Sequence, residues 1–111
     1  MQISFKSAKL AKTLNDEALM KRKYGSANAK QLRLRLAVLH AAPTLADVPT
    51  VPPDRCHQLH ADWKGCFAVD LQHPHRLVFE PDHDPIPRTA DGGIDRLRVT
   101  AITILDVLDY H

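Results

Sequence analysis

The chain has 111 residues, of which 44% are hydrophobic and 25% charged, as expected for one globular domain spanning residues 1–111 with a modest core. Apolar runs are too short to span a membrane, and the N-terminal Met-Gln-Ile-Ser-Phe-Lys lacks the apolar core of a signal peptide. We therefore expect a cytoplasmic protein with no membrane partner. In that compartment Cys56 and Cys66 would stay reduced.

The net charge of +2 is unevenly distributed along the chain. Residues 1–42 carry nine Lys or Arg against two acidic residues, whereas residues 43–111 carry six basic and eleven acidic residues. A basic half on a nearly neutral chain suggests an anionic partner, either nucleic acid or an acidic protein segment. The alternative is a set of solvated helix faces without a partner.

The first half of the chain predicts one strand and three helices. Ile3 and Phe5 alternate with polar residues, which is typical of an edge strand. Ser7 can cap a short helix, and Asn15 or Asp16 can cap a second helix that ends at Tyr24, before Gly25. The clearest helix is predicted over residues 27–41, because Pro43 prevents it from continuing. Its apolar stripe consists of Ala29, Leu32, Leu36 and Leu39, with Lys30, Arg33 and Arg35 off the stripe.

The second half changes to a period of two. A proline-rich connector over residues 43–54 can hold one helical turn at most. Strands are predicted over residues 55–60, 66–71, 75–80 and 99–108, with a polar loop at 81–95 that contains the turn Asp91-Gly92-Gly93. Helices followed by a run of strands indicate an α+β fold, in which an N-terminal helical hairpin packs on a small, mainly antiparallel sheet.

The last predicted strand is apolar on both faces. Strict alternation places Ile102, Ile104 and Leu108 on one face; the other face takes Val99, Ala101, Leu105 and Val107. Such a strand is usually central and covered on both sides. It leads directly into Asp109-Tyr110-His111, in which alternation puts Asp109 and His111 on one face and Tyr110 on the other, unless a bulge or bend intervenes.

A metal site is one interpretation of the histidines and cysteines. Cys56, His57, His60 and Cys66 are residue types that bind zinc. In a strand over residues 55–60, however, Cys56 and His60 share a face while His57 points to the other, and no Cys-x-x-Cys pair supports them. We therefore expect no metal and no cofactor.

A second set of residues could perform acid–base chemistry on a phosphate. It consists of His57, Arg76, Asp109, Tyr110 and His111, which an antiparallel meander can place on neighbouring strands. Two imidazoles can exchange protons near neutral pH, an arginine can hold a phosphate, and a carboxylate can orient an imidazole. These groups suffice for metal-free RNA cleavage, in which the ribose 2′-hydroxyl attacks the adjacent phosphate. A single histidine or arginine on a sheet is more often a surface or structural residue, so the prediction depends on the whole set.

Taken together, these segments resemble the HigB-type toxins of the RelE/ParE superfamily, some of which are named killer or plasmid-maintenance proteins. The resemblance is carried by Arg-Cys-His-Gln-Leu-His-Ala-Asp-Trp-Lys-Gly-Cys-Phe-Ala-Val-Asp-Leu over residues 55–71, by His-Arg-Leu-Val-Phe-Glu over residues 75–80 and by the final Asp-Tyr-His. It extends to the N-terminal Ile-Ser-Phe-Lys and the helical hairpin. The segment over residues 81–96 is longer and more acidic than in the shortest of these toxins.

The resemblance implies the toxin of a bacterial type II toxin–antitoxin system, acting as a ribosome-dependent mRNA endonuclease. In this interpretation His57 and His111 share proton transfer, Arg76 holds the scissile phosphate, and Asp109 and Tyr110 orient substrate and imidazole. Residues that would contact RNA are His60, Lys64, Lys30 and Arg33. The implied partners are the ribosome, mRNA and a HigA-type helix-turn-helix antitoxin, with operator DNA reached only through the antitoxin.

Two alternatives use the same fold. One is a ParE-like inhibitor directed at gyrase, for which His57 and His111 would be dispensable. The other is a weakly active relative whose main role is to bind its antitoxin.

Overall fold

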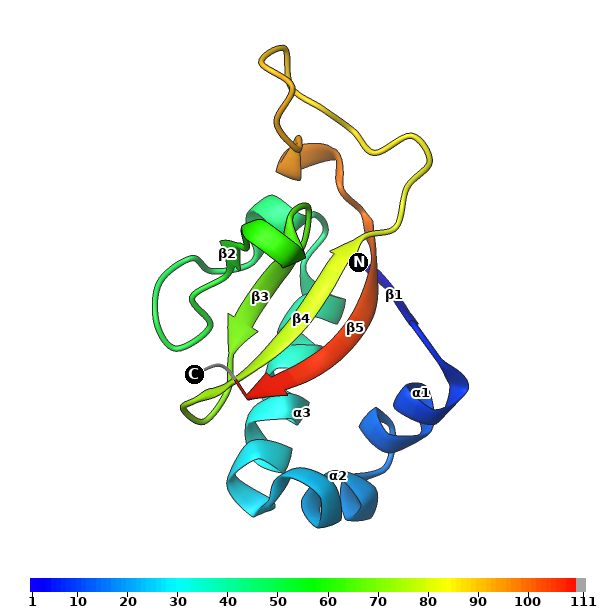
Figure 1. The fold of residues 1–111 in the computed structure, drawn as a ribbon, viewed down its shortest axis with the longest axis vertical. Coiled ribbons are helices and arrows are strands. Elements are labelled where there is room, and N and C mark those ends of the chain that lie inside the picture. The colour runs from blue at the N-terminus through cyan, green and yellow to red at the C-terminus, as the bar shows by residue number, and fades with distance from the viewer. Residues whose placement is uncertain (110–111) are drawn as a thin grey trace.

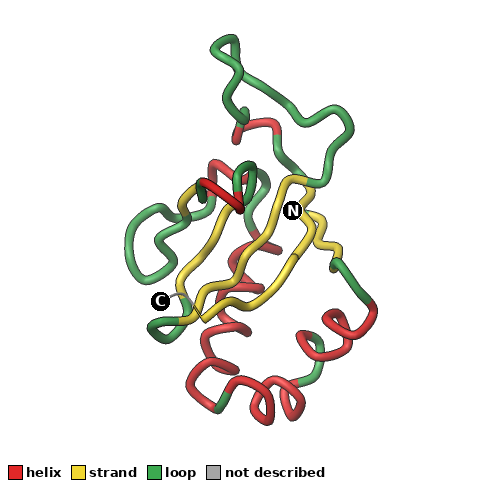
Figure 2. The backbone as a smooth tube through the Cα atoms, viewed as in Figure 1, coloured by secondary structure: helices red, strands yellow, loops and turns green. Residues whose placement is uncertain are grey.

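The computed structural model describes residues 1–109 and contains three α-helices and one five-stranded sheet (Figures 1 and 2). The elements in chain order are β1 (Gln2–Phe5), α1 (Ala8–Leu14), α2 (Glu17–Tyr24), α3 (Ser26–Ala41), β2 (His57–Gln58), β3 (Phe67–Asp70), β4 (His75–Pro81) and β5 (Ala101–Asp109). Short 3-10 turns occupy Leu45–Asp47, Ala61–Trp63 and Arg96–Arg98. Within residues 1–109, none of the helices has the length and apolarity needed to cross a membrane.

The helices begin and end where the sequence predicts. The Ser7 side chain accepts a hydrogen bond from the Leu10 amide at 3.1 Å, and the Asp16 carboxylate accepts from two amides at the start of α2. Both contacts satisfy amide groups that the first turn of a helix leaves unpaired. Gly25 adopts a φ of +87°, which favours glycine, and it separates α2 from α3.

The sheet has the strand order β1-β5-β4-β3-β2. Strand β1 lies at one edge, as predicted, and pairs in parallel with β5. The other neighbouring pairs are antiparallel. The α+β class is confirmed, and the parallel edge pair makes the sheet mixed.

Hydrophobic residues form a large core on one face of the sheet and a small cluster on the other. Helix α3 covers the first face (Figure 1). On that face the rings of Phe67 and Phe79 stack with their centroids 6.1 Å apart. We call the opposite side the open face, because no helix of the described chain covers it (Figure 1). Its apolar cluster consists of Leu59, Cys66, Ala68 and Val78, flanked by Trp63, Leu105 and Leu108. Strand β5 lies inside the sheet between β1 and β4, as predicted for a strand that is apolar on both faces, but helices cover it on one side only.

A bulge in β5 changes which residues share a face. Phe79 pairs with Ile104 and Val78 with Asp106, so Leu105 is the extra residue. The bulge shifts the alternation by one position, and Val107 joins Ile102 and Ile104 in the helix-side core. The predicted assignment of Leu108 and Val107 was therefore wrong, because strict alternation cannot anticipate an inserted residue.

The predicted strand over residues 55–60 is much shorter in the structure. Only His57 and Gln58 pair with β3. Arg55 has a left-handed φ of +46°, and its amide donates to the Val51 carbonyl at 2.9 Å, which places it in a turn of the connector. After Gln58 the chain leaves the sheet and enters the 3-10 turn over Ala61–Trp63.

The start of the last strand and the loop before it also differ from the prediction. Strand β5 begins at Ala101 instead of residue 99, because a 3-10 turn over Arg96–Arg98 precedes it. The loop before that turn is partly ordered, since Arg88 and Ile94 form an isolated antiparallel bridge across the glycine turn.

Arg35 is buried, although the sequence places it on the solvated side of its helix. Its side chain is 6% exposed, and its Nε donates to the carbonyl of Asp70 at 2.7 Å. The guanidinium also donates to the Pro53 carbonyl at 3.3 Å and lies 3.4 Å from the Asp54 carboxylate. This one side chain therefore joins α3 to the end of β3 and to the connector that leads into β2.

Replacement of Arg35 by methionine should destabilise the protein strongly. The Arg35→Met change leaves Asp54, which is 6% exposed, as a buried charge without its counter-ion. We expect a loss of about 3–5 kcal/mol in the free energy of unfolding, measured by urea denaturation. Arg33→Met is the matched control, because the Arg33 side chain is 52% exposed and lies 3.8 Å from Glu17; its loss should stay within about 0.5 kcal/mol. Equal effects of the two changes would contradict the role of Arg35.

Candidate functional site

The strand register places His57 and Arg76 on the open face of the sheet. His57 pairs with Ala68, which pairs with Val78, and all three positions belong to that face. Arg76 lies two residues before Val78 on β4 and therefore also faces this side. One strand, β3, separates the two residues, so their backbones are about 10 Å apart perpendicular to the strands and, because they are two residues out of register, about 7 Å apart along them. The predicted pairing of a histidine with an arginine on one surface is thus consistent with the register.

The backbone of Arg55 sets the orientation of the His57 ring. His57 Nδ1 lies 2.7 Å from the Arg55 carbonyl oxygen. Because a carbonyl can only accept, Nδ1 carries the proton, and in the neutral ring Nε2 is then the acceptor. The left-handed φ of Arg55 places its carbonyl at this position. The half-buried imidazole is therefore held in the tautomer that a general base requires.

Asp70 holds two arginines at the same site. Its carboxylate accepts from Arg55 Nε at 2.7 Å and from a second nitrogen of the Arg55 guanidinium at 3.2 Å. Arg76 Nε lies 3.6 Å from Oδ1 of the same carboxylate. The hydrogen bond to Asp70 raises the pKa of Arg55. Two guanidinium groups against one carboxylate leave a net positive charge that can attract a phosphate.

Arg55 and Asp70 are absent from the residues predicted as functional. Asp70 lies at the end of an otherwise apolar strand, directly across from Arg76 in the register. An opposite-charge pair across two strands is a recognisable signal once the register is known. The contribution of Arg55 depends on a left-handed backbone that the sequence does not reveal.

The terminal triplet is described only in part. Asp109 is exposed and pairs with His75, whereas Leu108 pairs with Arg76. Alternation therefore places Asp109 on the helix side of the sheet, away from the face of His57 and Arg76. The bend expected near the terminus is not found up to residue 109, and the bulge lies upstream at Leu105. Tyr110 and His111 lie outside the described residues, so their predicted roles stay predictions.

The residues predicted to contact RNA fall into two groups. His60 and Lys64 are exposed beside the 3-10 turn that follows β2, close in the chain to His57. Lys30 and Arg33 are exposed on α3, which packs against the opposite face of the sheet (Figure 1). The structure therefore keeps Lys30 and Arg33 apart from the surface that carries His57.

The two cysteines do not form a disulfide and belong to different cores. Cys56 is buried in the helix-side core, and Cys66 in the cluster of the open face. Over residues 1–109, His, Cys, Asp and Glu side chains form no group of three or more that could hold a metal ion. Burial raises the pKa of Cys56 to about 11, so its thiol is neutral at physiological pH.

The α+β arrangement of helices and sheet is shared with a solved toxin structure. The solved structure of a YoeB/ParE toxin from Agrobacterium tumefaciens matches over 100% of both chains, with a TM-score of 0.56 and 9% sequence identity. At this identity the likeness shows the fold alone. No protein-family model and no curated protein sequence matches the chain significantly.

The raised pKa of Cys56 should make the stability of the protein depend on alkaline pH. The folded thiol keeps its proton up to about pH 11, whereas the unfolded thiol loses it near its ordinary value of 9.0. The contribution of the protonated Cys56 thiol to the free energy of unfolding is therefore complete below pH 9. That contribution falls by roughly 2–3 kcal/mol as the pH rises toward 11. Urea denaturation of wild type and Cys56→Ala between pH 8 and 11 measures this as a smaller decline in the variant. Parallel declines would contradict the prediction.

Proposed function

We propose that this protein is the toxin of a bacterial type II toxin–antitoxin system and that it cleaves mRNA without a metal. The observation that supports this most directly is the shared placement of His57, Arg55 and Arg76 on the open face. A base with its acceptor nitrogen available and two cations around one carboxylate suit a phosphodiester. The RelE/ParE-like fold, which a YoeB/ParE toxin also has, supports the same class.

In the proposed reaction His57 Nε2 takes the proton of the ribose 2′-hydroxyl. The oxygen of that hydroxyl forms a bond to the adjacent phosphorus as the bond from phosphorus to the 5′-oxygen breaks. The products are a 2′,3′-cyclic phosphate and a 5′-hydroxyl, whose proton comes from a general acid. We propose His111 as this acid. Arg76 and Arg55 stabilise the charge that develops on the phosphate oxygens.

Asp70 has a positioning role in this proposal. It touches both guanidinium groups and holds them on the same side of β3. Tyr110 keeps its proposed role of orienting substrate and imidazole. Asp109, whose register places it on the helix side of the sheet, could act only on substrate that reaches around the end of the β4–β5 pair. The exposed His60 and Lys64 would extend the positive surface beyond β2.

The partners follow from the class of protein. We propose that a HigA-type helix-turn-helix antitoxin neutralises the toxin and that this complex, through the antitoxin, binds operator DNA. The ribosome would present the mRNA. The basic segment over residues 1–42 would then contact ribosomal RNA, with Lys30 and Arg33 exposed on α3 for that purpose.

Replacement of His57 should abolish the toxicity. Expression of the wild type in a bacterium should arrest growth and fragment cellular mRNA, and His57→Ala should lower the rate of cleavage at least about 100-fold, because the base is lost. His40→Ala is the matched control, since His40 is exposed in the last turn of α3, and it should cleave like wild type. Primer extension on mRNA with and without ribosomes measures the cleavage.

Two outcomes would contradict the proposal. If His57→Ala remains as toxic as the wild type while DNA supercoiling falls, the protein acts on gyrase without nuclease chemistry. If the wild type neither arrests growth nor cleaves mRNA but binds its antitoxin, its role is binding alone.

A further inference from the structure

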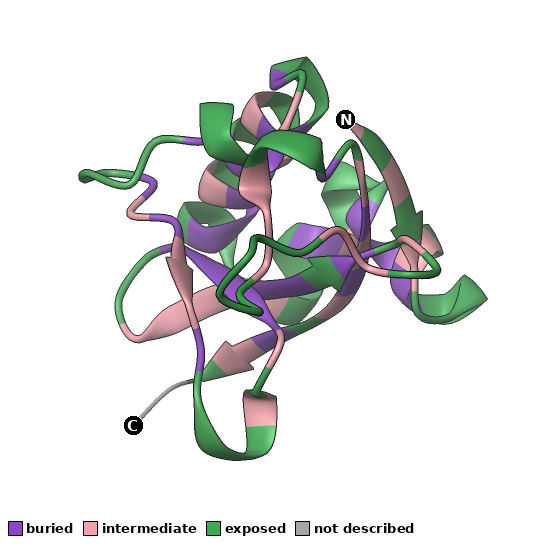
Figure 3. Cartoon of the chain, turned by 90° about the horizontal axis from the view of Figure 1, so that it is seen from above, coloured by how far each residue is buried: buried purple, intermediate pink, exposed green. Residues whose placement is uncertain are grey.

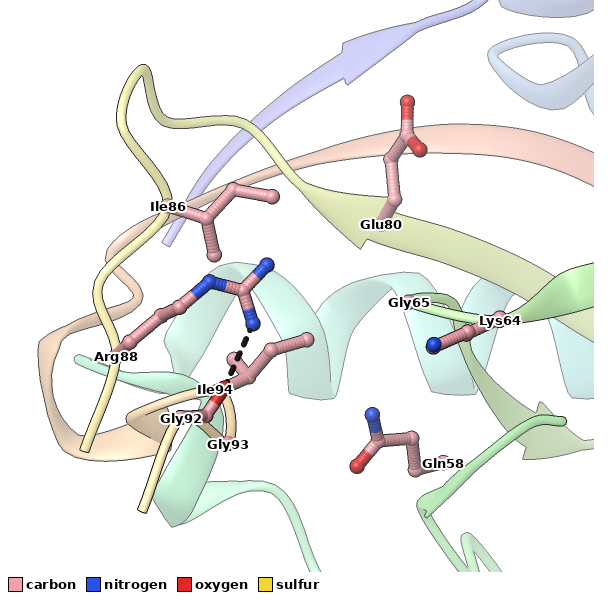
Figure 4. A pocket seen from close by; sticks show the side chains of 9 residues that line it. All are labelled: Gln58, Lys64, Gly65, Glu80, Ile86, Arg88, Gly92, Gly93 and Ile94. Atoms are coloured by element: carbon pink, nitrogen blue, oxygen red, sulfur yellow. Dashed lines mark hydrogen bonds between the residues drawn. The ribbon is translucent and has the colours of Figure 1, made fainter. Parts of the chain in front are cut away.

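We infer that the pocket beneath the loop over residues 82–95 binds one nucleotide of the RNA substrate next to the cleavage site and thereby gives the nuclease a sequence preference. This inference rests on the proposed function. The pocket has a volume of about 500 Å³, which is in the range of small-ligand sites. It lies between that loop, the end of β4 and the turn that joins β2 to β3 (Figure 4).

The loop that forms the pocket is held in place by its own contacts. The amide of Thr89 donates to the Gly93 carbonyl at 2.8 Å, next to the bridge between Arg88 and Ile94. At the base of the loop the Arg96 guanidinium lies 4.9 Å from the centroid of the Phe67 ring. Most residues of the loop are exposed, and Figure 3 draws the exposed parts of the chain in green. An exposed segment with this many internal contacts is a preformed wall, which reduces the entropic cost of binding.

Two cations reach into the pocket from opposite sides. Arg88 extends from the loop and Lys64 from the β2–β3 connection, so that their charged ends point toward the same space (Figure 4). Arg88 donates to the Gly92 carbonyl at 2.9 Å, which fixes the plane of the guanidinium and leaves further N–H donors for a ligand. The Glu80 carboxylate also belongs to the wall but is directed away from Lys64 (Figure 4). A phosphate is therefore the anion that fits between Arg88 and Lys64.

The rest of the wall suits a nucleobase. Ile86 and Ile94 are half-buried and offer an apolar surface on which a base can rest. The Gln58 amide points into the same space and can both donate and accept at the edge of a base (Figure 4). The two cations can bind a phosphate, and the apolar wall and the amide can bind a base, so the pocket as a whole suits a nucleotide. An acidic peptide would contact the cations but would not need the apolar wall or the amide.

Gln58 connects the pocket to the site. It is the direct chain neighbour of His57 on β2, and the two side chains point to opposite faces of the sheet. An RNA strand that passes the edge of β2 can therefore present its scissile phosphate to His57 and an adjacent nucleotide to the pocket. The pocket would then select which sequences are cleaved, while the chemistry stays with His57.

The first test measures binding without cleavage. The probe is an RNA trinucleotide with 2′-O-methyl groups, which cannot undergo attack by the 2′-oxygen, titrated into 15N-labelled protein. We expect shifts of the Gly65, Gly92 and Gly93 amides, which line the pocket, and at least tenfold weaker binding by Arg88→Ala. A trinucleotide without its central base should also bind at least tenfold more weakly. Arg22→Ala, which removes an exposed arginine from α2, should bind within twofold of wild type.

Three results would overturn the inference. Arg88→Ala and the abasic probe can bind as wild type does, the shifted amides can lie outside the pocket, or Arg88→Ala can weaken only the complex with an antitoxin. A urea denaturation curve for Arg88→Ala that matches wild type separates loss of binding from loss of fold. If Arg88→Ala is less stable than wild type, Arg88→Lys takes its place, because lysine keeps the charge but not the planar guanidinium. Its affinity for the probe should lie between that of wild type and the tenfold weaker affinity expected for Arg88→Ala.

The second test separates this inference from the proposed function. On ribosome-bound mRNA, Arg88→Ala should redistribute the cleavage sites and lower their rates about tenfold, whereas His57→Ala should remove cleavage everywhere. An unchanged distribution and rate in Arg88→Ala beside an inactive His57→Ala would overturn the pocket and leave the function intact. An active His57→Ala would overturn the proposed function, and the binding measurement would still decide the pocket.

Discussion

The candidate site depends on the contacts that the buried Arg35 guanidinium makes. It bonds to the Asp70 carbonyl at the end of β3 and to the Pro53 carbonyl in the connector, and it neutralises the buried Asp54. The connector has little regular structure of its own, so these contacts fix where it enters β2. A buried ion pair of this kind adds little net stability compared with an apolar replacement of the whole group, but loss of one partner is costly. Arg35 therefore acts mainly by specifying one arrangement of helix, connector and sheet.

That arrangement brings together residues that carry the proposed chemistry. Asp70 belongs to the site because it binds Arg55 directly, and Asp54 is next to the site because Arg55 follows it in the chain. The Arg55 carbonyl in turn orients His57. A series of contacts therefore connects the buried Arg35 side chain of α3 to the His57 imidazole on the open face. The site is partly exposed, while the contact that positions it is shielded from water.

The open face itself owes its character to two deviations from regular structure. The bulge at Leu105 turns Val107 inward, so that Leu105 and Leu108 remain to cover Val78 on a face without a helix. The loop over residues 82–95 extends beyond the end of β4 and the start of β5 and adds a wall that the sheet alone would not have (Figure 1). The first deviation keeps the face apolar near the centre of the sheet, and the second forms a pocket beyond the end of β4.

The sequence by itself determined the helices, the order of elements and the α+β class, because caps, glycine and hydrophobic period act over a few residues. It also predicted that His57 and Arg76 could share one surface, which the strand register allows, while their role stays a prediction. Only the tertiary structure decided that Arg35 is buried, that Asp70 joins two arginines and that Asp109 pairs with His75. Each of these depends on residues far apart in the chain, or on a single inserted residue that shifts a strand register. Periodicity reports which side chains leave water, but it does not report which distant partner each of them meets.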